Sequence, residues 1–312
     1  MSFFSVSTFN MQDKKSKIIG HVLAFVTILV WGSTFISTKV LLSEFSPVQI
    51  MICRFVIAYF VLWIIYPKPQ KTKLKDELLF AVMGMFGCTL YFIAENNALS
   101  FTFASNVSII VASSPVITAL LAHFFIKGEK LNRNIWIGFF VAFSGVIMVV
   151  LNGKFVLKLN PAGDFLSLVA AISWSVYSVV LRTCVDRYNS VMLTRKLMFY
   201  GFLTSFPVML AQNDAMPFEA FKKPEMLFNI LFLGVIGSGI CYVLWSNAVL
   251  RLGVVTTNNY IYLNPFVTLV VGGIVLSEPI TFMSVLGAVL IVFGVVVGSK
   301  KPKERLNSHS LR

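Results

Sequence analysis

One carboxylate and one guanidinium lie inside apolar stretches of this chain and are the groups best suited to chemistry. Glu95 follows Tyr91 in the sequence YFIAENN, and Arg54 lies about seven residues into an apolar run that begins near residue 47. An ionised side chain in such a stretch costs about 2.5–3.5 kcal/mol or more to insert into a membrane. Glu95 could bind a substrate ammonium group or a proton, form an ion pair with Arg54 between two helices, or extend to the membrane surface.

Aromatic and amide side chains in other apolar stretches are further candidates. Trp31 and Trp174 lie in the middle of their stretches rather than in the aromatic belt at a membrane surface. They either pack at the centre of the protein or stack against a ligand. We expect the wall of a substrate cavity to be formed by Glu95, Arg54, Tyr91, Trp31, Trp174, Tyr177, Tyr242, Trp245, Tyr260 and Asn264.

Two prolines interrupt apolar stretches. Pro115 and Pro265 each remove a backbone donor and leave a carbonyl oxygen, near Val111 and Ile261 respectively, that needs another partner. Kinks in two matched helices would suit gating, although proline is also common in transmembrane helices without such a role. Polar neighbours such as Ser114 favour a water-lined stretch.

These residues are distributed over ten apolar stretches. The chain of 312 residues is 57% hydrophobic and 12% charged, a balance that a soluble core of this size does not use. A membrane-spanning helix needs about 20 mostly apolar residues, and the sequence lacks the alternation of a β-barrel. We therefore predict an all-α membrane protein of ten transmembrane helices. The spans are expected near residues 18–38, 47–66, 77–97, 104–126, 134–151, 163–183, 191–211, 226–248, 255–276 and 281–298.

The basic residues predict how the chain is oriented. With the N-terminus in the cytoplasm, twenty of the 26 lysines and arginines fall on the cytoplasmic side, five fall outside, and Arg54 lies within a span. Positive residues concentrate on the cytoplasmic side of membrane proteins, so both termini are expected there. The net charge of +13 comes without the interleaved aromatic residues of a nucleic-acid surface, and no nucleic-acid partner is expected.

The sequence offers no metal, cofactor or catalytic pattern. The four cysteines fall in different spans without metal-ligand spacing, and no G-x4-G-K-[ST] sequence for ATP occurs. An intramembrane enzyme would need converging His, Asp, Ser or Cys groups. His21 and His123 instead lie near the ends of their spans, and His309 is in the C-terminal tail. We expect neither enzymatic activity nor a bound metal or cofactor.

The two halves of the sequence repeat. Trp31 aligns with Trp174 at an offset of 143, and Pro115 aligns with Pro265 at an offset of 150. Further matched pairs are Gly20 with Gly163, Lys39 with Arg182, Gly84 with Gly234, Asn97 with Asn247, and Gly138 with Gly287. Because each repeat has five spans, the second copy enters the membrane from the opposite side. Inverted halves can alternate a central cavity between the two sides, which indicates transport.

The repeat also shows where the halves differ. Glu95 aligns with Trp245, and Arg54 aligns with Leu197, so the charged pair exists in the first half alone. We hypothesise that matched residues maintain the scaffold, whereas unmatched ones shape an asymmetric substrate site.

Several short motifs together carry a family resemblance. They are Trp31-Gly32-Ser33-Thr34-Phe35, Asn97-Ala98-Leu99, the mid-helix prolines, Gly128-Glu129 and Ser277-Glu278-Pro279. This set resembles the EamA branch of the drug/metabolite transporter superfamily over roughly residues 18–298. The resemblance implies a bacterial inner-membrane carrier whose first, third and fourth helices in each half line a cavity, and many such carriers export amino acids. The expected parts are an N-terminal cytoplasmic tail (1–17), a first repeat (18–151), a linker (152–162), a second repeat (163–298) and a basic tail (299–312).

The predicted function is secondary transport of a small metabolite, an amino acid or related amine-bearing compound, by alternating access and in the export direction. Protons are a candidate coupling ion, and the oligomeric state cannot be predicted. The alternatives are import or exchange of a nucleoside- or adenosyl-type metabolite, and multidrug efflux.

Overall fold

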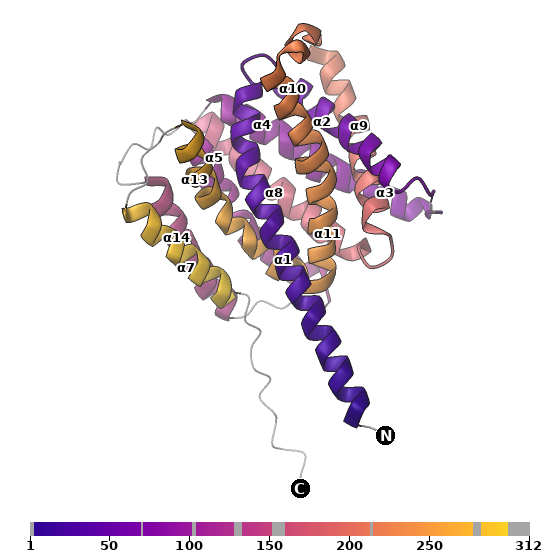
Figure 1. The fold of residues 1–312 in the computed structure, drawn as a ribbon, viewed down its shortest axis with the longest axis vertical. Coiled ribbons are helices and arrows are strands. Elements are labelled where there is room, and N and C mark those ends of the chain that lie inside the picture. The colour runs from indigo at the N-terminus through magenta and orange to yellow at the C-terminus, as the bar shows by residue number, and fades with distance from the viewer. Residues whose placement is uncertain are drawn as a thin grey trace.

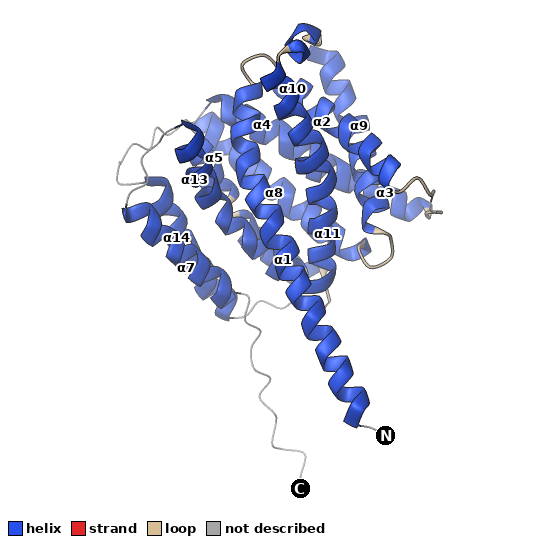
Figure 2. Ribbon diagram, in the orientation of Figure 1, coloured by secondary structure: helices blue, strands red, loops and turns tan. Residues whose placement is uncertain are grey.

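Helices make up all the regular structure in the described part of the chain (Figures 1 and 2). The computed structural model describes residues 3–69, 71–101, 104–127, 133–151, 160–212, 215–276 and 282–298. Each of the ten predicted spans falls on one helix or on consecutive helical segments. The prediction of an all-α membrane protein built from two inverted five-span halves is confirmed. Among the described residues, five helical runs are long and apolar enough to cross a membrane uninterrupted, at 14–41, 47–65, 74–101, 161–184 and 224–252.

The first half begins with a long helix and ends with a helix that packs against the second half. Its elements are α1 (Phe3–Leu41), α2 (Pro47–Ile65), α3 (Leu74–Gly84), the π-helix η1 (Met85–Leu90), α4 (Tyr91–Phe101), α5 (Ala104–Val111), α6 (Ser114–Phe125) and α7 (Arg133–Leu151).

The second half follows the same plan. Its elements are α8 (Pro161–Cys184), α9 (Ser190–Gln212), the 3-10 helix η2 (Phe218–Lys222), α10 (Pro224–Leu231), the π-helix η3 (Phe232–Ile240), α11 (Cys241–Leu252), α12 (Val254–Asn258), the 3-10 helix η4 (Asn259–Leu263), α13 (Asn264–Leu276) and α14 (Phe282–Gly298).

Helix α1 starts well before the first predicted span and projects from the bundle at its N-terminal end (Figure 1). The sequence before Gly20 contains neither glycine nor proline, so nothing in it ends a helix early. Helix α2, in contrast, has a sharp start. Ser46 accepts a hydrogen bond from the Gln49 backbone, the Gln49 side chain accepts one from the Ser46 backbone, and Pro47 occupies the first turn.

The third span of each half contains a π-helix at the same place in the repeat. Segment η1 directly follows Gly84, and η3 contains the matched Gly234. A Cβ on Gly84 would lie 2.6 Å from Cβ of Tyr200, and one on Gly234 would lie 2.6 Å from Cγ2 of Ile57. The third span of each half therefore packs closely on the second span of the other half. This contact is reciprocal, as an inverted repeat requires.

The fourth span of each half is broken near its proline. Helix α5 ends at Val111 and α6 begins at Ser114, so Pro115 lies in the first turn of a new helix. Helix α12 passes through η4 before α13 begins at Asn264, immediately before Pro265. Proline is tolerated in a first turn because its missing N–H has no partner there. Both prolines mark interruptions of the span, and their role in gating stays a prediction.

The fifth spans, α7 and α14, lie side by side and join the two halves (Figure 1). Small residues allow this close approach. A Cβ on Gly138 would lie 2.6 Å from the Gly294 carbonyl oxygen, and a Cβ on Gly294 would lie 2.5 Å from the Ala142 backbone nitrogen. The partner of this small-residue face is therefore the other half of the same chain.

Replacing Gly294 with leucine is expected to destabilise the protein. The new side chain meets backbone atoms of α7 that cannot move aside, and overpacking of this kind costs about 1–3 kcal/mol. The midpoint of thermal unfolding in detergent measures the effect. Val296→Leu is the matched control, because Val296 is half exposed on the same helix. Equal unfolding midpoints for the two variants would contradict the close α7–α14 contact.

Candidate substrate cavity

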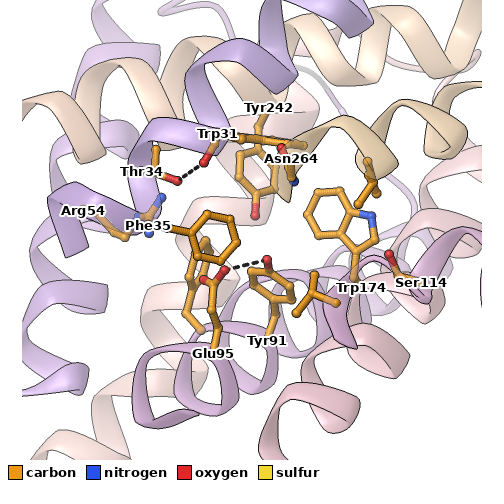
Figure 3. Close-up of a pocket in the computed structure, with 13 residues that line it drawn as sticks. Trp31, Thr34, Phe35, Arg54, Tyr91, Glu95, Ser114, Trp174, Tyr242 and Asn264 are labelled. Atoms are coloured by element: carbon orange, nitrogen blue, oxygen red, sulfur yellow. Dashed lines mark hydrogen bonds between the residues drawn. The ribbon is translucent and has the colours of Figure 1, made fainter. Parts of the chain in front are cut away.

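A small cavity lies between the two halves (Figure 3). Its wall comes from the first, third and fourth spans of both halves, with Arg54 added from the second span of the first half. The lining residues are Trp31, Thr34, Phe35, Arg54, Tyr91, Phe92, Glu95, Val111, Ser114, Trp174, Tyr242, Ile261 and Asn264. The cavity volume is about 30 Å³, enough for one or two water molecules. A metabolite needs more room, so this is a closed arrangement.

Much of the lining consists of repeat-related pairs. Trp31 and Trp174 are one pair, and Phe92 and Tyr242 are another. Val111 and Ile261, and likewise Ser114 and Asn264, also match at the offset of 150 and also line the cavity. Equivalent residues from two inverted halves meet where the pseudo-twofold axis passes. The cavity therefore lies on that axis.

Glu95 is buried and faces the cavity. Glu95 is 7% exposed. Its carboxylate accepts a hydrogen bond of 2.9 Å from the hydroxyl of Tyr91, which lies one turn earlier on α4 (Figure 3). The i, i+4 spacing places both side chains on one helix face. Glu95 therefore lies inside the protein and does not extend to the membrane surface.

Arg54 enters the cavity from α2 and is 2% exposed. Its Nε donates to the Ser238 hydroxyl at 2.7 Å, and its guanidinium carbon lies 4.0 Å from the centre of the Phe92 ring. Ser238 belongs to η3, so Arg54 joins the second span of the first half to the third span of the second half. A cation over an aromatic face and a bond to a hydroxyl hold the guanidinium in place but leave its charge unneutralised.

The two charges share a cavity without forming an ion pair. Within the described residues, no ion pair joins Arg54 to Glu95, and each has its own neutral hydrogen-bond partner. The structure therefore does not contain the direct ion pair between two helices that the sequence offered as an alternative. A buried carboxylate and a buried guanidinium instead face the same small space.

Two buried polar atoms in the wall also lack partners. The Ser114 hydroxyl oxygen and the Asn264 carboxamide oxygen have no hydrogen-bond partner among the described residues. They are equivalent positions of the two repeats, each in the first turn of the helix after the break. Buried polar atoms are normally hydrogen-bonded, to protein or to water or ligand. These atoms are available to whatever occupies the cavity.

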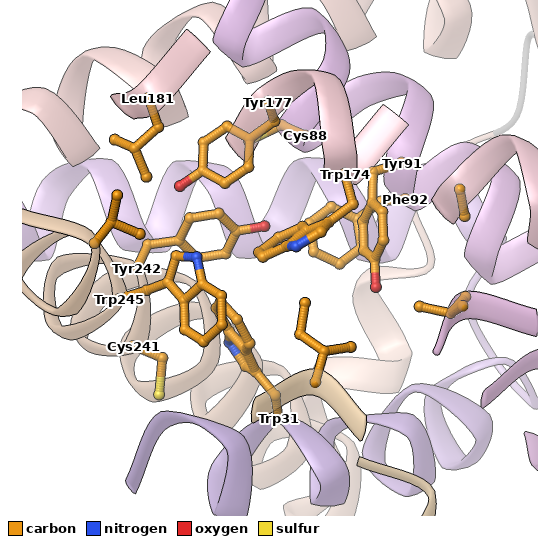
Figure 4. Close-up of a cluster of buried hydrophobic side chains, with 14 of the residues drawn as sticks. Trp31, Cys88, Tyr91, Phe92, Trp174, Tyr177, Leu181, Cys241, Tyr242 and Trp245 are labelled. Atoms are coloured by element: carbon orange, nitrogen blue, oxygen red, sulfur yellow. The ribbon is translucent and has the colours of Figure 1, made fainter. Parts of the chain in front are cut away.

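A cluster of aromatic rings lies beside the cavity (Figure 4), and three of its members, Trp31, Trp174 and Tyr242, also line the cavity. The Trp31 ring centre lies 5.1 Å from that of Trp174, 5.0 Å from that of Trp245 and 5.3 Å from that of Tyr242. Tyr177 extends the cluster, 5.0 Å from Trp174. Centroid distances of this size are typical of favourable aromatic packing. The cluster joins rings from both halves of the chain.

The hydrogen bonds of the two matched tryptophans differ. Nε1 of Trp31 donates to the Gly237 carbonyl oxygen at 2.9 Å, whereas Nε1 of Trp174 donates to Oδ1 of Asn258 at 2.9 Å. The carbonyl equivalent to Gly237 is that of Gly87, and it accepts instead from the Tyr242 hydroxyl at 3.1 Å. Both carbonyls belong to the π-helices, which often mark functional sites. The two halves therefore make different hydrogen bonds around one set of equivalent positions.

Most of the candidates from the sequence meet at this site, and some do not. Seven of them line the cavity: Glu95, Arg54, Tyr91, Trp31, Trp174, Tyr242 and Asn264. Tyr177 and Trp245 lie in the aromatic cluster behind the lining. Tyr260 does not line the cavity, because η4 directs it to α1, where its hydroxyl lies 2.7 Å from Nδ1 of His21.

Several lining residues were not among the candidates predicted from the sequence. They are Thr34, Phe35, Phe92, Val111 and Ile261, with Ser114 noted only as a neighbour of Pro115. Phe92 could have been found from the repeat, because it aligns with Tyr242. The others are ordinary apolar or hydroxyl residues with no signal of their own. In the described part of the chain, no group of three or more His, Cys, Asp or Glu side chains could hold a metal ion.

The fold and cavity define the class of protein. Two inverted five-span halves around a shared cavity are the architecture of a membrane transport protein. The chain belongs to the EamA-like transporter family, since residues 18–151 and residues 161–299 each match it. This is a family of carriers rather than enzymes.

Relatives agree with this family assignment, and a solved structure agrees with the fold. A transporter of Archaeoglobus fulgidus is 29% identical over 90% of this chain and 97% of its own length. A transporter of Bacillus subtilis is 26% identical over 86% of this chain and 89% of its own length. A protein of Streptantibioticus cattleyicolor, described as a probable terminal-alkyne amino-acid exporter, is 25% identical over 88% of this chain and 92% of its own length. A crystal structure with 18% identity superposes with a TM-score of 0.72 over 91% of this chain and 98% of its own, which supports the fold.

Trp31→Phe is expected to lower stability although it keeps an aromatic ring. The change removes the only N–H of the side chain and leaves the Gly237 carbonyl oxygen without its tryptophan donor, which costs about 1–3 kcal/mol for a buried group. Trp136→Phe is the control, because the Trp136 ring is 38% exposed and contacts only other rings in its described interactions. Thermal unfolding in detergent compares the variants, and an unchanged midpoint for Trp31→Phe would argue against this bond.

Proposed function

We propose that this protein is a secondary transporter that exports a small zwitterionic metabolite, an amino acid or a close relative, across the bacterial inner membrane by alternating access. The observation that carries the proposal is that Glu95 and Arg54 face one closed cavity without an ion pair between them. Both are buried in the membrane interior, where a charge is costly unless it meets an opposite charge.

A zwitterion satisfies both charges at once. Its ammonium group pairs with the Glu95 carboxylate, and its carboxylate pairs with the planar guanidinium of Arg54, whose fork suits two parallel hydrogen bonds. A cationic drug would leave Arg54 unpaired, and a neutral nucleoside would leave both groups unpaired. The charge pattern therefore favours an amino acid over the alternatives of nucleoside exchange and multidrug efflux.

The rest of the wall suits the remaining parts of such a ligand. The rings of Trp31, Trp174 and Tyr242 offer apolar surface for a side chain and aromatic faces for an ammonium group. The unpartnered oxygens of Ser114 and Asn264 can accept further hydrogen bonds from the ammonium group or a bound water. The name of the Streptantibioticus relative, a probable amino-acid exporter, also supports amino-acid export.

Removing either charge is expected to weaken binding of the zwitterion. Glu95→Gln should weaken amino-acid binding at least about tenfold, because the ammonium group loses a buried charged partner. Arg54→Gln should do the same through the carboxylate. The affinity is measured by the thermal stabilisation of purified protein, because a ligand stabilises according to its concentration over its dissociation constant. The ligands are a panel of amino acids, each tested with its decarboxylated amine and its N-acetyl derivative.

Glu219→Gln is the matched control. Glu219 is an exposed carboxylate that pairs with Lys222 at 2.8 Å outside the cavity, and its loss should leave binding unchanged. Flux of the same panel in proteoliposomes then tests transport itself. If the amines bind as tightly as their amino acids, and Arg54→Gln binds them normally, the substrate is a cation and the zwitterion proposal is wrong.

The proposed orientation places both termini in the cytoplasm. A fluorescent protein fused after Arg312 should be fluorescent in bacteria, and alkaline phosphatase fused after Leu151, in the linker expected outside, should be active. The excess of basic residues on one side provides the reason. Active phosphatase at the C-terminus would overturn the orientation. Active phosphatase at both positions would require an even number of spans in the second half and would overturn the inverted repeat as well.

A further inference from the structure

A second cavity lies where α2 ends and α9 begins. Its volume is about 420 Å³, within the range of small-molecule sites. The loop after α2 closes one end with two prolines, and α9 forms the opposite wall. The lining residues are Tyr59, Trp63, Pro67, Pro69, Met192, Arg195, Lys196 and Phe199. None of them belongs to the central cavity, so this groove needs its own explanation.

The rim of the groove is strongly basic. Arg195 donates to the carbonyl oxygens of Tyr66 at 2.6 Å and Lys68 at 3.3 Å, and thereby fixes the end of α2. Lys196 donates to Glu77 at 2.7 Å, which uses one of its three donors. The adjoining loop and the start of α3 add exposed lysines. They are Lys68, Lys71, Lys73 and Lys75.

The acidic residues nearby are already engaged. The carboxylate of Asp76 accepts hydrogen bonds of 2.6 Å from Arg187 and from the Tyr188 hydroxyl, and the latter bond raises the pKa of Tyr188. Glu77 accepts from Lys196 and from the Tyr200 hydroxyl. These pairs leave the lysines of the loop in excess, so the rim attracts anions.

The wall on the other side of the rim is aromatic and apolar. Trp63 is 51% exposed and Phe199 is 42% exposed, and both face outward beside the groove from the two helices that form it. The apolar surface continues along the same helices through Phe60, Leu203 and Phe206. Tryptophan near the end of a transmembrane helix is typical of the level of lipid headgroups.

We propose that this groove binds an anionic phospholipid. The phosphate lies at the basic rim formed by Arg195 and Lys196 with the neighbouring loop, and one acyl chain runs over Trp63 and Phe199 along the outside of the bundle. Basic pockets between transmembrane helices bind acidic headgroups in this way. A zwitterionic lipid lacks the net negative charge that the rim complements. A soluble anion would gain nothing from the aromatic wall.

The position gives the lipid a mechanical role. Helix α2 belongs to the first half and α9 to the second, and they cross beside each other. A lipid in the groove touches both halves at once. It therefore stabilises the arrangement in which these second spans are close together, independently of what the central cavity carries.

Native mass spectrometry of the purified full chain tests the proposal with phosphatidylglycerol, phosphatidylcholine and inorganic phosphate as probes. The expected result is one tightly bound phosphatidylglycerol, weak phosphatidylcholine binding and no retained phosphate. Lys196→Gln should weaken phosphatidylglycerol binding about fivefold, since one basic residue near a lipid surface is worth about 1 kcal/mol. Trp63→Leu should also weaken it, because the acyl chain loses the aromatic wall of the groove.

Lys127→Gln is the matched control, because Lys127 is an exposed lysine after the end of α6 and does not line the groove. It should bind phosphatidylglycerol as the wild type does. Trp63→Leu removes no charge and no ion pair, so it tests the site even if Lys196→Gln disturbs the Glu77 contact. Equal binding of the two lipids, competition by inorganic phosphate alone, or unchanged binding by both groove variants would each overturn the proposal.

Discussion

The burial of Arg54 is the constraint on which the cavity depends. A charged guanidinium inside a membrane protein is costly unless protein groups bind it and keep it away from the lipid. Here those groups are the Ser238 hydroxyl of η3 and the face of the Phe92 ring. They come from the third span of the opposite half and of its own half. Because neither is negatively charged, the positive charge remains available on the cavity side. Glu95 likewise has a neutral partner, because it accepts its hydrogen bond from the Tyr91 hydroxyl.

The scaffold around these charges is symmetric, and the charges themselves are not. Matched glycines let the third spans pack on the second spans of the opposite half, and other matched glycines join the fifth spans. These contacts need small residues in both repeats. At the position of Glu95 the second repeat has Trp245, and at that of Arg54 it has Leu197. At these two positions the first half has charges and the second half has apolar side chains, so the charge distribution is asymmetric although the scaffold is symmetric.

The sequence could predict the spans and the repeat, because hydropathy and residue identity are properties of the chain alone. It could not predict the partners of Arg54. The α-helical rise of 1.5 Å per residue gives the height of a residue in the membrane but not the direction in which its side chain points. The π-helix η1 precedes Tyr91 and turns the residues after it to a different face. Tyr260 was predicted to line the cavity, but it lies in the 3-10 helix η4 and its side chain contacts His21 instead.

The two π-helices connect this geometry to alternation. Gly237 and Gly87 present equivalent carbonyl oxygens, one bound by Trp31 and the other by Tyr242. If the halves exchange conformations, Trp174 takes the place of Trp31 and donates to the Gly87 carbonyl oxygen, which Tyr242 then either shares or releases. Tyr242 also lines the cavity. A ligand that contacts Tyr242 differently in the two arrangements therefore biases the exchange, which is the differential interaction that coupling of binding to conformational change requires.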